Sequence, residues 1–254
     1  MSSTQTNAAP PPAAMHGRVI YLLAAVVIVQ VIYPMTTDGT ALSNIIYNLL
    51  GLSFLVAGVL ISRENPTDMR ILIGLGVLWG IMFFVYSFNP ENTVILLAAY
   101  FAYAAFEIMV IKVLMQFVFS ARTVSRDVLY AAVAVYFLLG AVFVPIYGTL
   151  DTITFAQTGD HAFSDVTIGE DEIFPWQNLI YYSYATLTTL GYGDVLPLTP
   201  WARSFASLQA VVGVLYLTII MARLVSLYVA DESESAIEAA VPTERESEAA
   251  HAGD

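Results

Sequence analysis

The sequence predicts an all-α membrane protein with six spanning helices and a shorter re-entrant helix between the fifth and the sixth. Of its 254 residues, 58% are hydrophobic and 12% are charged, whereas a soluble domain carries about 25% charged residues. The apolar residues gather into long runs, and six of these reach the roughly 20 residues needed to cross a bilayer.

The six long runs are expected to form the spanning helices, at about 18–35, 43–61, 70–88, 93–119, 126–148 and 200–229. A seventh run, at about 174–188, begins with Phe174-Pro175-Trp176, and proline suits the first turn of a helix. At roughly 15 residues this run is too short to span, but it fits a helix that enters and leaves on one face.

The cations predict the orientation, because cytoplasmic loops are rich in Lys and Arg. If both termini are cytoplasmic, seven arginines all lie on the cytoplasmic side of the membrane: Arg18, Arg63, Arg70, Arg122, Arg126, Arg223 and Arg245. The opposite loops, 36–42, 89–92 and 149–173, contain no Lys or Arg, and Arg203 is the only outer cation. We therefore expect a multi-pass protein of the cell membrane with both termini in the cytoplasm.

Composition excludes several other classes of protein. The sequence has no cysteine, which excludes disulfides and thiolate metal sites. His16, His161 and His251 lie outside the apolar runs, which excludes an intramembrane histidine site. The net charge of −12 argues against a nucleic-acid partner. The sequence contains no nucleophile elbow and no phosphate-binding loop, so no enzyme activity is predicted.

The most informative segment is residues 188–195, T-T-L-G-Y-G-D-V. Gly191 and Gly193 flank Tyr192 and can adopt positive φ at little cost. An extended segment that alternates ordinary and mirror-image backbone points successive carbonyls to one side. Four such segments around an axis would form rings of oxygens that replace the hydration shell of a cation. Because one segment cannot surround an ion and the chain has one copy, the motif predicts a homotetramer.

The segment 184–194, Y-A-T-L-T-T-L-G-Y-G-D, resembles the pore-helix end and selectivity filter of the tetrameric potassium channel superfamily. The chain is similar to small bacterial six-span members that lack a fused cytosolic regulatory domain. The resemblance covers about residues 126–229, and the first four spans match by hydropathy alone. It implies passive, potassium-selective conduction across the lipid bilayer, with permeant K⁺ ions and no other cofactor.

Four units follow from this resemblance. The tails 1–16 and 231–254 are expected to be disordered, because the first is small, polar and proline-bearing and the second is glutamate-rich and too short to bury a core. The first tail has no basic residue ahead of an apolar stretch, unlike a signal peptide. Residues 17–121 form a four-helix membrane domain, and residues 122–230 form the pore domain.

The resemblance assigns the K⁺ sites to consecutive residues. The Thr189 hydroxyl and carbonyl would supply the innermost site, and the carbonyls of Leu190, Gly191 and Tyr192 the upper rings. Gly193 would end the filter at the outer mouth. Leu190 stands where valine is commonest and lacks its β-branching, which lowers backbone stiffness. Tyr192 favours potassium, because nonselective relatives tend to replace it.

Filter support is assigned to Thr188, Asp194 and an aromatic collar. The Tyr192 ring is expected to point away from the axis, toward candidates Tyr181, Tyr182 and Trp176; an interfacial aromatic belt is the alternative for Trp176. Ala185 replaces a glutamate that some members pair with the aspartate, so inherited inactivation behaviour is not expected.

Acidic residues surround the predicted outer mouth: Asp151, Asp160, Asp165, Glu170, Asp171, Glu172 and Asp194. Fourfold assembly would turn them into a field that concentrates cations. The alternative is a merely solvated acidic loop.

The last run supplies the predicted gate. Gly213 lies 20 residues after Gly193, the offset of the family's hinge glycine, and a helix-packing contact is the alternative. Val214, Leu217, Met221 and Val225 share one helix face. They would line the inner cavity and an apolar constriction that gates by dewetting, or face lipid instead.

The fourth run does not predict a voltage sensor. A sensor needs roughly 3–4 gating charges on this helix. The run contains Glu107, Lys112 and Gln116, and it has no arginine ladder. Weak or absent voltage dependence is expected. Glu107 and Lys112 are expected to pair with polar groups of other spans, such as Gln30, Asn44 and Asn48. A degenerate sensor or a ligand site is the alternative.

Other functions stay open beside the potassium channel. These are a nonselective cation channel, the pore subunit of a potassium uptake system, and a membrane scaffold with a vestigial filter. Uptake systems carry several pore loops in one chain, whereas this sequence has a single loop and no internal repeat.

Overall fold

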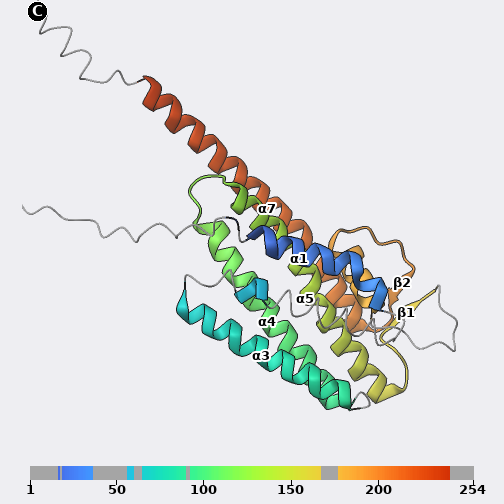
Figure 1. The fold of residues 1–254 in the computed structure, drawn as a ribbon. Coiled ribbons are helices and arrows are strands. Elements are labelled where there is room, and N and C mark those ends of the chain that lie inside the picture. The colour runs from blue at the N-terminus through green and yellow to red at the C-terminus, as the bar shows by residue number, and fades with distance from the viewer. Residues whose placement is uncertain are drawn as a thin grey trace, which may run out of the picture.

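The computed structural model describes residues 17, 19–36, 56–59, 65–89, 92–166 and 177–240, which are mostly helical (Figure 1). The elements in chain order are α1 (Val19–Ile32), the 3₁₀ turn η1 (Tyr33–Thr36), α3 (Pro66–Phe88), α4 (Thr93–Ser120), α5 (Arg126–Thr158), β1 (Phe163–Asp165), α6 (Gln177–Leu187), β2 (Val195–Pro197) and α7 (Pro200–Ala240).

Four of these helices, α3, α4, α5 and α7, are long and apolar enough to cross a membrane. They match the helices predicted at about 70–88, 93–119, 126–148 and 200–229. Helix α1 is apolar but has 14 residues, fewer than the roughly 20 that span a bilayer. The predicted run at about 43–61 lies mostly outside the described residues.

Polar capping residues move several helix ends away from the predicted ones. The Asn65 side chain accepts hydrogen bonds from the backbone N–H groups of Thr67 and Asp68, and Pro66 occupies the first turn, so α3 begins ahead of its apolar run. Helix α5 ends at Thr158 and is capped by Gly159, whose φ of 81° is left-handed. Helix α7 continues to Ala240, past the boundary predicted at residue 230 and into the segment expected to be disordered.

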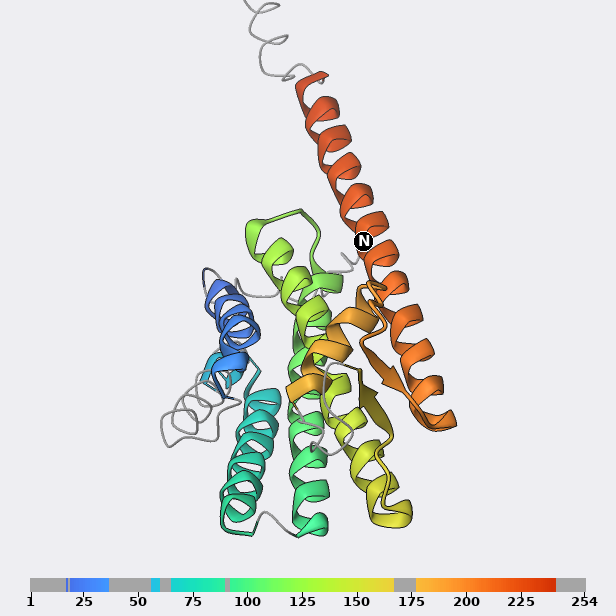
Figure 2. The same ribbon diagram turned by 90° about the vertical axis from the view of Figure 1, so that its right-hand side faces the viewer.

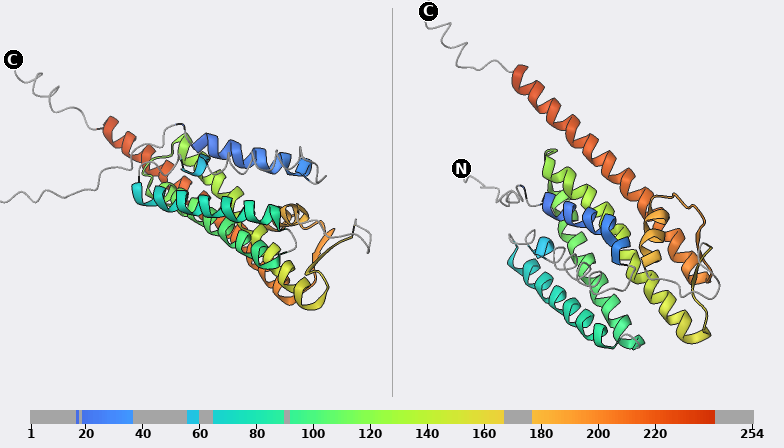
Figure 3. Two further views of the ribbon diagram at one scale, coloured as in Figure 1. Left: turned by 60° about the horizontal axis from the view of Figure 1, so that its bottom comes forward. Right: turned by 45° about the vertical axis from the view of Figure 1, so that its right-hand side comes forward.

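Helix α5 lies at the centre of the fold and contacts α1, α4, α6 and α7, while α3 packs on the other side of α4. Figure 2 shows α6 lying between α5 and α7. The views in Figure 3 show α7 extending past the ends of the other helices toward the C-terminus. One buried apolar cluster joins α1, α3, α4, α5 and α7, and a second fills the space among α5, α6, α7 and the two strands.

The all-α prediction missed one element, a short antiparallel pair. β1 pairs with β2, with Phe163 opposite Pro197 and Asp165 opposite Val195. Each strand has three residues, too few to show the alternation that predicts a strand. The pair joins the segment after α5 to the segment before α7.

Lys112 has a different partner from those predicted. Its ammonium lies 3.2 Å from the Asp68 carboxylate, which links α4 to the first turn of α3. The prediction that Lys112 pairs with a polar group of another span is therefore confirmed, but the partner is Asp68 and not the suggested Gln30; Asn44 and Asn48 lie outside the described residues.

Arg223 of α7 holds the end of α4. Its guanidinium donates to the carbonyls of Phe119 at 2.5 Å and Ala121 at 3.0 Å, with a longer contact of 3.4 Å to Val118. The last carbonyls of a helix have no partner within it, and a cation there also interacts favourably with the helix dipole. The predicted four-helix domain and pore domain are therefore joined directly at this end of the fold.

Candidate functional site

The segment after α6 leaves the helix by a tight reversal. The Thr189 N–H donates to Thr186 at 3.0 Å, and the N–H groups of Leu190 and Gly191 both donate to the Ala185 carbonyl, at 2.8 and 3.2 Å. These bonds satisfy the end of the helix and fix the position of the residues that follow. Ala185, noted in the sequence only for the glutamate it replaces, therefore anchors the segment through its carbonyl.

Positive φ values occur at every second residue of this segment: 58° at Thr189, 53° at Gly191 and 81° at Gly193. Leu190 and Tyr192 between them have none. The two glycines adopt positive φ as their lack of a Cβ allows. Thr189 is the one non-glycine residue with positive φ in the described part of the chain. For a β-branched residue this costs on the order of 1–3 kcal/mol, and the sequence did not predict it.

The segment lies on the surface of the single chain. Residues 188–193 are all exposed, including 52% of Leu190 and 71% of Tyr192. The Tyr192 ring is therefore not packed behind the segment by residues of its own chain. A strained backbone that carries exposed apolar side chains is the feature here that points to another surface covering it.

Asp194 fixes the far end of the segment. The Tyr181 hydroxyl donates to its carboxylate at 2.6 Å, the carboxylate also accepts from the Val195 N–H at 3.0 Å, and the Asp194 carbonyl accepts from the Val166 N–H at 2.8 Å. The bond from Tyr181 holds the pKa of Asp194 below its usual value, because it stabilises the ionised carboxylate. The same bond, with burial and the charge of Asp194, raises the pKa of Tyr181 to about 12.

A buried polar network holds α6 between α5 and α7. The Gln209 amide of α7 donates to the Ser183 hydroxyl at 2.7 Å, and that hydroxyl donates to the Gly140 carbonyl of α5 at 2.6 Å. The Tyr147 hydroxyl of α5 donates to the Gln209 carbonyl oxygen at 2.5 Å. Gln209, Ser183 and Tyr147 are fully buried, where satisfied polar groups fix one arrangement. This network was not predicted from the sequence, although Gln209 inside a long apolar run was a visible signal.

The structure describes two of the three residues predicted to form the aromatic collar, Tyr181 and Tyr182. Tyr182 is buried and packs edge-on against Tyr147 and Phe163, with ring centroids 5.1 and 5.2 Å apart. It therefore secures α6 to α5 and β1. Tyr181 instead donates a hydrogen bond to Asp194, and Trp176 lies outside the described residues.

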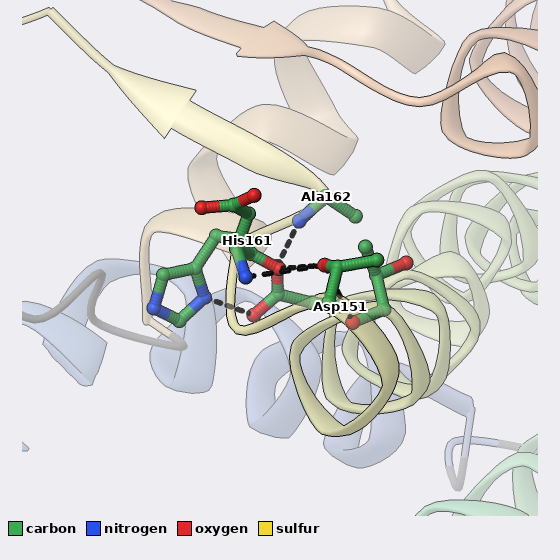
Figure 4. A network of polar contacts seen from close by, with 6 residues as sticks. Asp151, His161 and Ala162 are labelled. Atoms are coloured by element: carbon green, nitrogen blue, oxygen red, sulfur yellow. Dashed lines mark hydrogen bonds and ion pairs between the residues drawn. The ribbon is translucent and has the colours of Figure 1, made fainter.

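Besides Asp194, two of the predicted mouth carboxylates have local partners. Asp151, near the end of α5, lies 2.9 Å from the His161 ring and accepts from the Ala162 N–H at 2.7 Å (Figure 4). Asp165 accepts from the Asn178 amide at 2.7 Å. Both tie the loop to a helix. Asp160 is exposed, and the predicted carboxylates Glu170, Asp171 and Glu172 lie outside the described residues.

Gly213 brings α7 against the end of α6. A Cβ at this position would overlap the Leu187 carbonyl oxygen and lie 3.1 Å from the Leu187 side chain. This geometry makes Gly213 a packing contact; its role as a hinge stays a prediction. The predicted gate face is exposed along α7 in the single chain: Val214, Leu217, Met221 and Val225.

Residues 128–230 match the ion channel family. This match runs from α5 through the segment after α6 and into α7, and it covers the predicted pore domain. Together with the apolar helices, it indicates a membrane protein.

One curated relative is Two-pore potassium channel 5 of Arabidopsis thaliana, 34% identical over 98 residues. The alignment covers 39% of this chain and 22% of the relative, so the chain spans about a fifth of that protein's length. No solved structure matches the chain. The two matches support the predicted resemblance to pore-loop potassium channels.

Gly213→Ala is expected to lower stability, because the new methyl group must displace α7 from the end of α6. The expected loss is about 1–3 kcal/mol, the range for overpacking, measured as a lower thermal midpoint of the purified protein. Gly74→Ala is the matched control, since Gly74 lies inside α3 with nothing within 4 Å of the added Cβ, and alanine favours helix. A Gly213→Ala protein as stable as wild type would contradict the contact.

Tyr181→Phe is expected to lower the thermal midpoint by an amount that depends on pH. The lowered pKa of Asp194 means that its stabilisation is complete above its ordinary value of 3.8 and is lost as pH falls through the still lower folded value. The difference from wild type should therefore be constant from about pH 5 to about pH 9 and shrink in stronger acid. Tyr228→Phe, at an exposed position of α7, should show no difference. A gap that widens on acidification would contradict the assignment.

Proposed function

We propose that this chain is the subunit of a potassium-selective channel that conducts K⁺ passively through a homotetrameric pore. The observation that carries this proposal is the alternation of positive φ at Thr189, Gly191 and Gly193 in a segment held at both ends. Such a backbone points successive carbonyls to one side, and rings of backbone carbonyls are how potassium filters replace the hydration shell of the ion.

The proposed ion sites use the strained segment itself. Thr189 supplies the innermost K⁺ site, Leu190, Gly191 and Tyr192 supply the rings above it, and Gly193 closes the outer end. The exposure of this segment in one chain supports assembly, because four copies facing an axis would cover its apolar side chains. A neighbouring copy would then provide the packing surface that Tyr192 lacks in its own chain.

The proposed topology has six spans and a re-entrant pore helix. Helix α6 has 11 residues, too few to span, and it lies between α5 and α7, which suits a helix that enters and returns from the outer side. Helix α1, continued by the η1 turn to Thr36, and the run at about 43–61 would provide the remaining two spans. Both termini are then cytoplasmic, and the Tyr181–Asp194 end of the segment faces outward.

Conduction is proposed to depend weakly on voltage. Helix α4 carries one cation, Lys112, and its ammonium is already paired with Asp68. One paired charge cannot supply the roughly 3–4 gating charges of a sensor. The gate is assigned to the α7 face that includes Leu217, Met221 and Val225.

The name of the Arabidopsis relative, a two-pore potassium channel, supports potassium as the ion, at 34% identity over the matched region. A nonselective cation channel and the pore subunit of an uptake system are the competing functions, and a flux assay separates them. Fast, barium-blocked rubidium flux into proteoliposomes with exclusion of sodium supports the proposal. Flux of both ions supports the nonselective channel, and flux that saturates at carrier rates supports uptake.

Tyr192→Asp is expected to abolish the preference for potassium over sodium while flux persists, because the substitution removes the ring whose packing against a neighbouring copy would hold the carbonyl of residue 192 in place at the outer ion site. Bi-ionic reversal potentials in planar bilayers measure this preference. Leu198→Asp is the matched control: it adds the same charge to an exposed position beyond β2 and should keep the selectivity. Unchanged selectivity in Tyr192→Asp would exclude this segment as the filter.

A further inference from the structure

The Glu107 side chain is fully buried inside the helix bundle. It lies in the interior of α4, a helix long and apolar enough to span the membrane, and its exposed fraction is 0%. Neither of its carboxyl oxygens has a hydrogen-bond partner, and these are the only buried side-chain N or O atoms without one in the described part of the chain.

Among the described residues, the surroundings of Glu107 offer hydroxyls but no counter-ion. The Tyr103 hydroxyl faces the carboxyl from one turn earlier on α4, although the pair does not reach hydrogen-bond geometry. The Tyr184 hydroxyl of α6 interacts with it electrostatically. Lys112 is paired with Asp68 of α3. Across the described residues of α3 and α5, no cation acts on the carboxyl.

This environment favours the protonated, uncharged form of the Glu107 side chain. An unpaired carboxylate inside a protein or a bilayer is expensive, and the group avoids the cost by keeping its proton. A metal ion is a poor alternative occupant, because no group of three or more His, Cys, Asp or Glu residues gathers in the described ranges.

We propose that Glu107 is a proton-binding site inside the membrane domain, and that loss of its proton in alkaline solution disturbs the pore helix through Tyr184. The ligand of this site is therefore the proton. The effect on the pore rests on the proposed function, whereas the binding of the proton does not.

Tyr184 gives the site a route to the proposed filter. Its hydroxyl donates to the Phe137 carbonyl of α5 at 2.9 Å, and its ring occupies the space that a side chain at Gly140 would fill. Its own carbonyl accepts from the N–H of Thr188 at 3.0 Å and from the Thr188 hydroxyl at 2.7 Å. A carboxylate at Glu107 would compete with Phe137 for the Tyr184 hydroxyl, and a shift of Tyr184 would move Thr188.

Infrared difference spectroscopy tests the proton itself, with no need for conduction. Wild type minus Glu107→Gln should show the carbonyl band of a protonated carboxyl at neutral pH, and this band should disappear by about pH 10, beyond the interval in which buried carboxyls titrate. Glu232→Gln is the control, because Glu232 is exposed on α7. No band at neutral pH overturns the site, and a band that persists at about pH 10 overturns the proposed loss of the proton in alkali.

Rubidium flux as a function of pH tests the coupling. Wild-type flux should fall by on the order of fivefold between about pH 6 and about pH 10, the low end of the coupling between two sites. Glu107→Gln, which cannot ionise, should give a flat profile over this range. Identical profiles in the two proteins overturn the coupling even if the infrared band is present. Absence of flux in wild type at every pH instead counts against the proposed function.

Discussion

The alternating backbone between Thr189 and Gly193 is the constraint on which the rest of the candidate pore depends. A chain does not hold positive φ at every second residue unless its surroundings impose it, least of all at a threonine. Hydrogen bonds at both ends of the segment impose this backbone conformation. The Ala185 carbonyl accepts from two N–H groups at the end next to α6, and Tyr181 and the paired strands hold Asp194 at the other end.

These anchors work only if α6 itself cannot move. The Ser183–Gln209–Tyr147 network ties α6 to both neighbouring helices with every polar group satisfied. The close approach of α7 at Gly213 removes the remaining space at the end of α6. Helix α6 is thus a short, rigid support whose position is set by α5 and α7. The position of α6 in turn fixes where the following segment lies.

Hydropathy and turn chemistry were enough to predict the membrane-length helices α3, α4, α5 and α7, the short helix α6 and the positive φ of two glycines. What could not be predicted depends on contacts between residues far apart in the chain. The strain at Thr189 follows from how α6 ends, and the role of Gln209 follows from Ser183 and Tyr147. The Lys112–Asp68 pair joins two helices whose register no local pattern reveals. The strands are too short for an alternation to appear in the sequence.

The central claim is that the carbonyls of residues 189–192 coordinate K⁺ on the axis of four identical chains. Anomalous diffraction from crystals grown with thallium, a K⁺ mimic that scatters strongly, tests it most directly. The account predicts a fourfold assembly with a row of thallium peaks on its axis, level with the carbonyls of Thr189, Leu190, Gly191 and Tyr192. An assembly without a fourfold axis, or an axis with no thallium beside these carbonyls, would contradict it.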